Sequence, residues 1–227
     1  MTRVWIPSHI DLKIAAQLKS HESKPAAKVA PFITISRAFG CDGMDLAQNL
    51  LDRLNERDQG WYLFRRRMLF SEEGVQLSEE RLKQLDSFGH SEMQGYIREA
   101  LGMPNQRETV EQLVKIVFLL AKAGKVIFLG AGAALLTRKL QHGIHVRLNA
   151  SLDWRVDNHS KRWQEHTEDP YKLVQDQSRD RDSFIKTYLG QDICSFEHYD
   201  MVFNNEKVHA NHAAKLTLEL MKARGLL

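Results

Sequence analysis

Short apolar runs alternate along the chain with longer stretches in which apolar residues recur every three to four positions. The runs are rich in β-branched and aromatic residues, which is typical of strands. They lie at 32–36, 61–64, 126–129, 144–148 and 199–203. The stretches with helical spacing predict helices near 46–54, 105–124, 133–140 and 210–224. Strands that alternate with helices predict a three-layer α/β fold with a mainly parallel sheet.

Three regions depart from this alternation and suggest the domain organisation. Residues 1–31 hold a short helix after Ser8 and a linker with two prolines, so 32–227 form the main domain. Charged residues dominate 65–104, glycines break the helical pattern and no good strand is expected, which predicts a small helical insertion. A long polar helical stretch before the last strand is interrupted at Pro170.

The corner after the first predicted strand is a candidate phosphate site. The segment FITISRAFGCDGMDLA passes from a strand through a glycine turn into a helix, where backbone amides can cradle a phosphate. The full signature G-x-x-x-x-G-K-[ST] is absent. With Gly40 as the inner glycine, Asp42 falls at the last glycine and Gly43 at the lysine. An ordinary strand-to-helix connection therefore stays open as an alternative.

Composition limits the partners and the compartment. The 227 residues are 43% hydrophobic and 27% charged, which is typical of a soluble globular protein. The net charge of +3 is too small to demand nucleic acid as a partner. Two cysteines without a ligand pattern favour a cytoplasmic location, and the absence of a long apolar run argues against a membrane. The oligomeric state stays open, a homo-oligomer included.

Four stretches in order carry a resemblance to a known family. They are ITISRAFGCDGMDLA, WYLFRRRML, VIFLGAGAALLTRKL with IHVRLNASLDWRV, and SRDRDSFIKTYLG with YDMVFNNEKV. Together they resemble the cytidylate-kinase-like family of P-loop nucleoside-monophosphate kinases. The resemblance implies a P-loop NTPase-like fold, a monophosphate-binding insertion at 65–104 and a helical lid at 170–195. It also implies transfer of a phosphoryl group from ATP to a nucleoside monophosphate, with ATP and Mg²⁺ as cofactors.

The same resemblance suggests site residues. For the nucleotide these are Ser36, Arg37, Gly40, Cys41, Asp42, Gly43, Met44, Asp45 and Arg155. For the acceptor they are Arg65, Arg66, Arg67, Gly130 and Gly132. Arg181 and Arg179 fit a lid that folds over the transferring phosphate and are the catalytic candidates, with Arg181 favoured. A solvated helix start is the alternative for the Arg65–Arg67 run, and a solvent-exposed face for the lid arginines.

The chain departs from the family pattern at the expected phosphates. Asp42 replaces a glycine, Met44 stands where a basic residue is usual, and Ala131 replaces the arginine of Gly-Arg-Gly. Two cations are therefore missing and one anion is added. Asp42 and Asp45 suit Mg²⁺ as hard oxygen donors, but capping of the following helix is the favoured explanation. Arg147 lies within a strand, where a purely structural pair with a carboxylate is the alternative to a functional role.

Other functions stay open beside the kinase. A non-catalytic relative would keep the fold to bind a nucleotide or a protein partner through a degenerate phosphate loop. An RNA- or anion-binding module would use the Arg65–Arg67 run, but the small net charge makes nucleic acid an improbable partner. His209 and His212 lack a third ligand, so no metal site is predicted.

Overall fold

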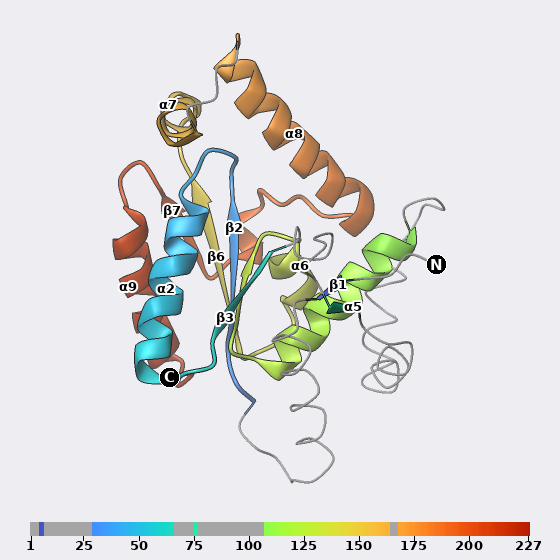
Figure 1. Cartoon of the computed structure of the whole chain (residues 1–227), viewed down its shortest axis with the longest axis vertical. Coiled ribbons are helices and arrows are strands. Elements are labelled where there is room, and N and C mark those ends of the chain that lie inside the picture. Colours follow the sequence, from blue (N-terminus) through green and yellow to red (C-terminus); the bar gives the residue numbers. More distant parts are fainter. Residues whose placement is uncertain (1–4, 7–28, 66–74, 77–106, 164–167) are drawn as a thin grey trace.

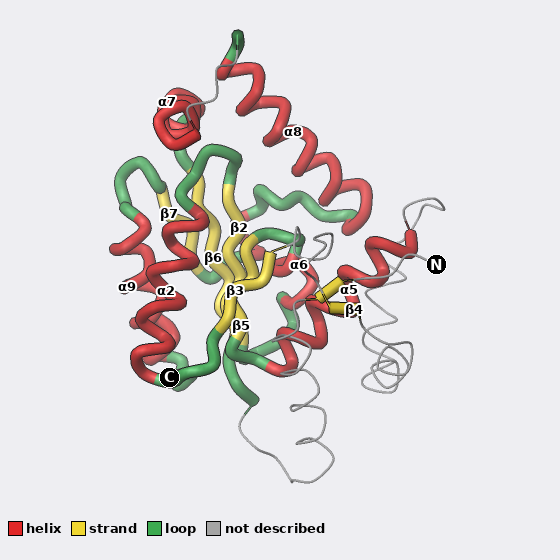
Figure 2. The backbone as a smooth tube through the Cα atoms, viewed as in Figure 1, coloured by secondary structure: helices red, strands yellow, loops and turns green. Residues whose placement is uncertain are grey.

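The computed structural model describes residues 5–6, 29–65, 75–76, 107–163 and 168–227. Its main sheet is made of β2 (Phe32–Arg37), β3 (Tyr62–Arg65), β5 (Val126–Leu129), β6 (Gly143–Asn149) and β7 (Met201–Asn204). The strands lie in the order β3-β5-β2-β6-β7 and every neighbouring pair is parallel (Figures 1 and 2). All five predicted strands are thus confirmed, each within two residues of its expected start.

Helices connect these strands as the helical spacing predicted. They are α2 (Gly43–Arg57), α5 (Arg107–Ala123), α6 (Ala133–Thr137), α7 (Leu152–Trp163), α8 (Pro170–Leu189) and α9 (Ala210–Ala223), with a short 3₁₀ turn at Phe196–His198. Pro170 is the first residue of α8, where its missing amide hydrogen costs no hydrogen bond. The side chain of Asp169 caps this helix by accepting from the amide of Lys172 at 2.9 Å.

Two hydrophobic layers hold the helices against the sheet. On one face, Phe128 of β5 meets Phe32 and Phe64 edge to face, with ring centroids 6.1 and 5.7 Å apart, under α5 and α6. On the other face, Ile33 and Ile35 of β2 pack under α2 and α9. Because β2 is covered on both sides, its sequence is a continuous apolar run. The predicted three-layer α/β architecture is confirmed.

One small feature corrects the sequence analysis. Val75–Gln76 form β4, which pairs antiparallel with β1, Trp5–Ile6, although no strand was expected between 65 and 104. Two residues are too few to carry a pattern, and pairing with a distant segment determines their conformation. The predicted helix after Ser8 and most of the linker and insertion lie outside the described residues. Of the described helices, none combines the length and apolarity that a bilayer crossing requires.

The topology brings the ends of several strands to one edge. The parallel strands β2, β3, β5 and β6 end at the same edge, and α7 and α8 stand beyond it (Figure 1). The connection from β2 to α2 and the glycine turn after β5 both lie at this edge. In open α/β sheets, ligands bind in the crevice outside the carboxyl ends of the strands.

Candidate functional site

The β2–α2 connection, residues 38–42, is a compact loop. The amide of Ala38 donates to the carbonyl of Leu148 at 3.0 Å, and the amide of Gly43 donates to the carbonyl of Cys41 at 2.8 Å. Gly40 has φ of +91°, and a methyl group added there would lie 2.6 Å from the carbonyl oxygen of Arg155. The loop therefore needs glycine at position 40, both for its backbone conformation and for its contact with α7.

One face of α7 holds this loop in place. Arg155 donates from Nη1 to the carbonyl of Phe39 at 3.1 Å and to Oγ of Ser178 at 3.1 Å. One turn on, Nδ2 of Asn158 donates to the carbonyl of Gly40 at 2.8 Å and to Oδ1 of Asp42 at 2.7 Å. The loop is therefore clamped by side chains from α7, and Arg155 further ties it to α8.

A charged cluster forms where the loop enters α2. Nη2 of Arg162 lies 2.9 Å from Oδ1 of Asp42, and the same guanidinium forms a two-pronged pair with Asp45, with Nη1–Oδ1 at 3.0 Å. Only 11% of the Asp42 side chain is exposed, against 42% for Asp45. One guanidinium thus neutralises much of the negative charge of two carboxylates.

The capping role expected for Asp42 is not found. Asp42 is the N-cap residue of α2, but its side chain makes no capping hydrogen bond. The carboxylate instead accepts a hydrogen bond from Asn158 and forms an ion pair with Arg162, so tertiary contacts replace the local cap. The amide of Asp42 donates to Oδ1 of Asn205 at 2.7 Å, and Asn205 is fully buried. Asp45 lies in the first turn of α2, where the helix dipole stabilises a carboxylate.

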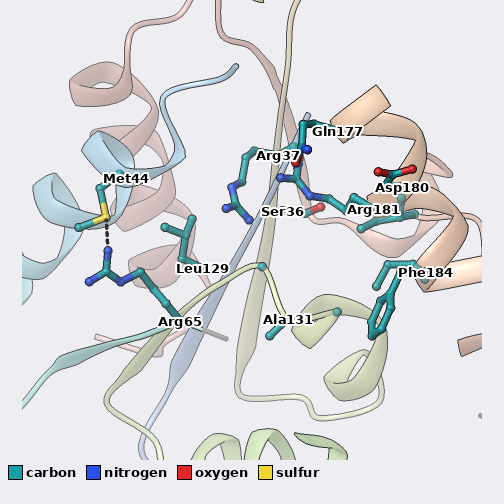
Figure 3. A pocket seen from close by; sticks show the side chains of 14 residues that line it. Ser36, Arg37, Met44, Arg65, Leu129, Ala131, Gln177, Asp180, Arg181 and Phe184 are labelled. Atoms are coloured by element: carbon teal, nitrogen blue, oxygen red, sulfur yellow. Dashed lines mark hydrogen bonds between the residues drawn. The ribbon is translucent and has the colours of Figure 1, made fainter. Parts of the chain in front are cut away.

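Two cavities adjoin the loop. The first, of about 530 Å³, is here named the loop cavity because residues 37–42 form one wall of it, with His159 and Arg162 opposite. The second, of about 550 Å³, is here named the strand-end cavity and is lined by Ser36, Arg65, the turn at 130–132 and α8 (Figure 3). Both cavities are lined by Arg37, Met44, Leu129, Gln177 and Arg181. The two spaces therefore meet at side chains from β2, α2, β5 and α8.

Arginines from three elements surround this junction. Figure 3 shows Arg37 at the centre of the strand-end cavity, Arg181 on α8 to one side and Arg65 on the other. Nη1 of Arg181 donates to the carbonyl of Arg37 at 2.7 Å, and its guanidinium carbon lies 5.8 Å from the centre of the Phe39 ring. Nη1 of Arg65 lies 3.8 Å from Sδ of Met44. A strongly cationic lining of this kind suits an anionic ligand.

Arg179 has a different position from Arg181. It pairs with Asp176 on its own helix at 2.6 Å, and 71% of its side chain is exposed. It lines neither cavity. Arg66 and Arg67 lie outside the described residues.

A buried arginine lies behind the strand-end cavity. Arg147 of β6 is 6% exposed and donates to Oγ of Ser36 at 2.9 Å and to Sγ of Cys194 at 3.3 Å. A carboxylate partner is absent among the described residues, because the donors of Arg147 bind hydroxyl and thiol groups instead.

The thiol of Cys41, in the loop, is neutral at physiological pH, because burial raises its pKa to about 12.

Comparison with known proteins identifies the relationship. A model of the cytidylate kinase-like family matches residues 32–207. The chain belongs to the cytidylate kinase-like family. The match begins at β2 and includes the loop, both cavities and α8, so the family resemblance expected from the four sequence stretches is confirmed.

One solved structure shares the fold of this chain. The crystal structure of an uncharacterized protein from Eubacterium ventriosum matches 86% of this chain and 99% of its own, with 16% identity and a TM-score of 0.64. A shikimate kinase from Bacteroides thetaiotaomicron matches 87% of this chain and 99% of its own, with 14% identity and a TM-score of 0.44. A comparison with the curated proteins found no match.

In this family member, the structure brings together most of the residues predicted for the site. One or both cavities are lined by Ser36, Arg37, Gly40, Cys41, Asp42, Met44, Arg65, Gly130, Gly132 and Arg181. Gly43 lies against Arg37, and Arg155 lies against Gly40. Asp45 pairs with Arg162, which also lines the loop cavity. Sequence reasoning missed Asn158, Arg162 and Asn205. For Asn158 and Arg162 the available signal was their spacing from Arg155, which places all three residues on one face of the helix.

Proposed function

We propose that the chain is a cytidylate-kinase-like phosphotransferase that moves a phosphoryl group from ATP to a nucleoside monophosphate. The observation that carries the proposal is the meeting of two cavities at Arg37 and Arg181. A two-substrate transfer needs a donor and an acceptor on either side of one transfer point. Each cavity has a volume typical of a small-molecule site, which is roughly 300–1,000 Å³.

The charges at the junction fit such a transfer. Phosphoryl transfer depends mostly on positioning and on neutralising the charge of the phosphates. In this proposal the donor's phosphates lie in the loop cavity, beside the guanidinium groups of Arg37 and Arg181. Among the described residues, the amides of Gly40 and Met44 have no hydrogen-bond acceptor, so both are available to phosphate oxygens.

The acceptor then belongs to the strand-end cavity. Arg65 lies at the end of β3 and can hold the acceptor's phosphate through its two-pronged guanidinium group. Gly130 and Gly132, in the turn after β5, also line this cavity, together with residues of α8. We assign the lid to 170–195, because α8 carries Arg181 over both cavities, and the monophosphate-binding insertion to 65–104. The resemblance points to a pyrimidine nucleotide as the acceptor.

The described residues do not present a Mg²⁺ site. Asp42 and Asp45 have the hard oxygen atoms that Mg²⁺ prefers, but Arg162 contacts both carboxylates. No step of the proposal therefore passes through a protein-bound ion. ATP supplies phosphate oxygens of its own to Mg²⁺, which usually keeps several waters.

A second function has one observation in its favour. Asp42 introduces a carboxylate into the loop, and its amide is already bound by Asn205 at 2.7 Å. Such a loop offers fewer donors to a polyphosphate, as a non-catalytic relative that binds a nucleotide or a protein partner would. This alternative predicts binding without turnover, or no ATP binding at all.

Turnover assays on the purified chain separate these functions. ATP and Mg²⁺ are supplied with CMP, UMP, AMP or GMP, and the nucleoside diphosphates are quantified by chromatography. The kinase predicts product with at least one acceptor and a loss of at least about tenfold in Arg181→Ala, since a cation at transferring phosphates typically contributes this much or more. Arg179→Ala is the matched control and should keep its activity. ATP binding without product, or no ATP binding at all, would contradict the kinase and favour the non-catalytic relative.

A further inference from the structure

The side chain of Arg37 occupies the space that a phosphate-loop lysine would need. Gly43 holds the position of that lysine in the loop pattern. A methyl group on Gly43 would lie 3.0 Å from Cδ and 3.2 Å from Cγ of Arg37, and 3.1 Å from Cδ1 of Leu129. A side chain at position 43 would therefore press against the arginine that runs past it, and one of the two would have to shift.

The far end of Arg37 is enclosed in the same way. Its Nη1 lies so close to Gly130 that a methyl group on this glycine would overlap with it. Gly130 also has φ of +79°, which L side chains rarely adopt. The arginine thus runs between two glycines, one at the start of α2 and one after β5, and its guanidinium lies at the junction of the two cavities.

The backbone of Arg37 is firmly held. It is the last residue of β2, paired in register with Leu148 of β6, and its carbonyl accepts from Arg181 of α8 at 2.7 Å. The side chain of Arg37 therefore starts from a backbone position that is fixed before a ligand arrives. This rigidity suits a group that must stay in place relative to two substrates.

We propose that Arg37 supplies, from the end of β2, the cation that a lysine within the loop supplies in the complete phosphate-loop signature. This inference rests on the proposed function and deepens it by naming the residue at the transferring phosphate. A loop lysine reaches the β- and γ-phosphates as a point charge, whereas the arginine can bind two phosphate oxygens at once. Gly43 and Gly130 leave the room that this larger side chain needs.

The proposal makes the two cations mutually exclusive, and this can be tested by exchanging them. Sodium triphosphate is titrated by calorimetry into the wild-type chain and into Arg37→Gln, Arg37→Lys, Gly43→Lys and the double variant Arg37→Ala/Gly43→Lys. Thermal melting of each variant verifies that it is folded. Arg57→Ala removes an exposed arginine at the opposite end of α2, about 20 Å along the helix, and serves as the control.

The variants should differ in their affinity for triphosphate in a defined order. Arg37→Gln should bind triphosphate about tenfold more weakly or worse, as expected for the loss of charge-assisted hydrogen bonds, whereas Arg37→Lys should keep most of the affinity. Gly43→Lys alone should lower the melting temperature, and the double variant should regain both stability and binding. Arg57→Ala should match the wild type.

The outcomes separate this inference from the proposed function. If the wild type binds triphosphate and Arg37→Gln binds equally well, the role of Arg37 is wrong while the kinase remains supported. A folded double variant that binds no better than Arg37→Gln would contradict the exchange of cations. If the wild type does not bind triphosphate or ATP, the proposed function itself fails.

Discussion

Replacing Asp42 with asparagine should tighten phosphate binding and weaken the fold at the same time. The Asp42 carboxylate lines the loop cavity and is almost buried between Nδ2 of Asn158 at 2.7 Å and Nη2 of Arg162 at 2.9 Å. Asparagine has nearly the same size and can keep an oxygen toward Asn158. The substitution therefore removes one negative charge and leaves the shape of the loop nearly unchanged.

The two effects have opposite signs and similar sizes. A like charge about 4 Å from a phosphate in a partly solvated site costs roughly 1–4 kcal/mol. Arg162 offsets part of this, so we expect a gain of about 1–2 kcal/mol, or roughly 5- to 30-fold in triphosphate affinity. Losing the ion pair should destabilise the fold by only about 1 kcal/mol, since Arg162 is 39% exposed and keeps Asp45 as a partner. This corresponds to about 2–4 °C in melting temperature.

Calorimetry with sodium triphosphate measures the first effect and thermal melting the second. The control is Asp58→Asn, which breaks a comparable pair with Lys125 at 2.6 Å at the far end of α2. It should leave triphosphate affinity unchanged. If Asp42→Asn binds triphosphate no better than the wild type, Asp42 does not oppose phosphate and the electrostatic reasoning is refuted.

Three further predictions concern stability. Burial lowers the pKa of His145 to about 4 from an ordinary 6.5, so between these pH values the unfolded chain binds a proton that the folded chain does not. The free energy of unfolding should therefore fall by about 3 kcal/mol as the pH falls from 6.5 to 4. Denaturant titrations of His145→Asn should show that this dependence on pH is lost. Gly40→Ala should cost about 2 kcal/mol in urea unfolding because of its φ of +91° and its contact with Arg155; a cost near zero would contradict the described loop. Asn205→Ala should cost about 1–3 kcal/mol in the same assay, since the fully buried Asn205 supplies the acceptor for the amide of Asp42. A neutral effect would contradict that contact.

The sequence was sufficient for features that local patterns encode. The run Val126–Leu129 is apolar because β5 is buried on both faces, and Leu46, Leu50 and Leu54 recur at helical spacing because one side of α2 packs on the sheet. The glycine turn between β2 and α2 was likewise visible as a break between a strand and a helix. These elements place the candidate site without any long-range information.

Partners that come from distant segments could not be predicted in this way. Asp42 meets Asn158 and Asn205, which follow it by 116 and 163 residues, and no local pattern links these positions. Helix capping was a sound expectation for an isolated helix start, but donors on α7 bind the carboxylate instead. The position of Arg37 against Gly43 likewise depends on the packing of a strand against a helix and a turn.

The central claim is that the amides at the corner between β2 and α2 meet a phosphate, and amide chemical shifts test it most directly. ATP with Mg²⁺ is titrated into the ¹⁵N-labelled chain, and backbone shifts are followed residue by residue. The account predicts that the largest changes fall on residues 39–45, with changes at 130–132 growing when a nucleoside monophosphate is added. A saturating titration that leaves 39–45 unmoved, or that shifts only residues remote from this corner, would contradict it.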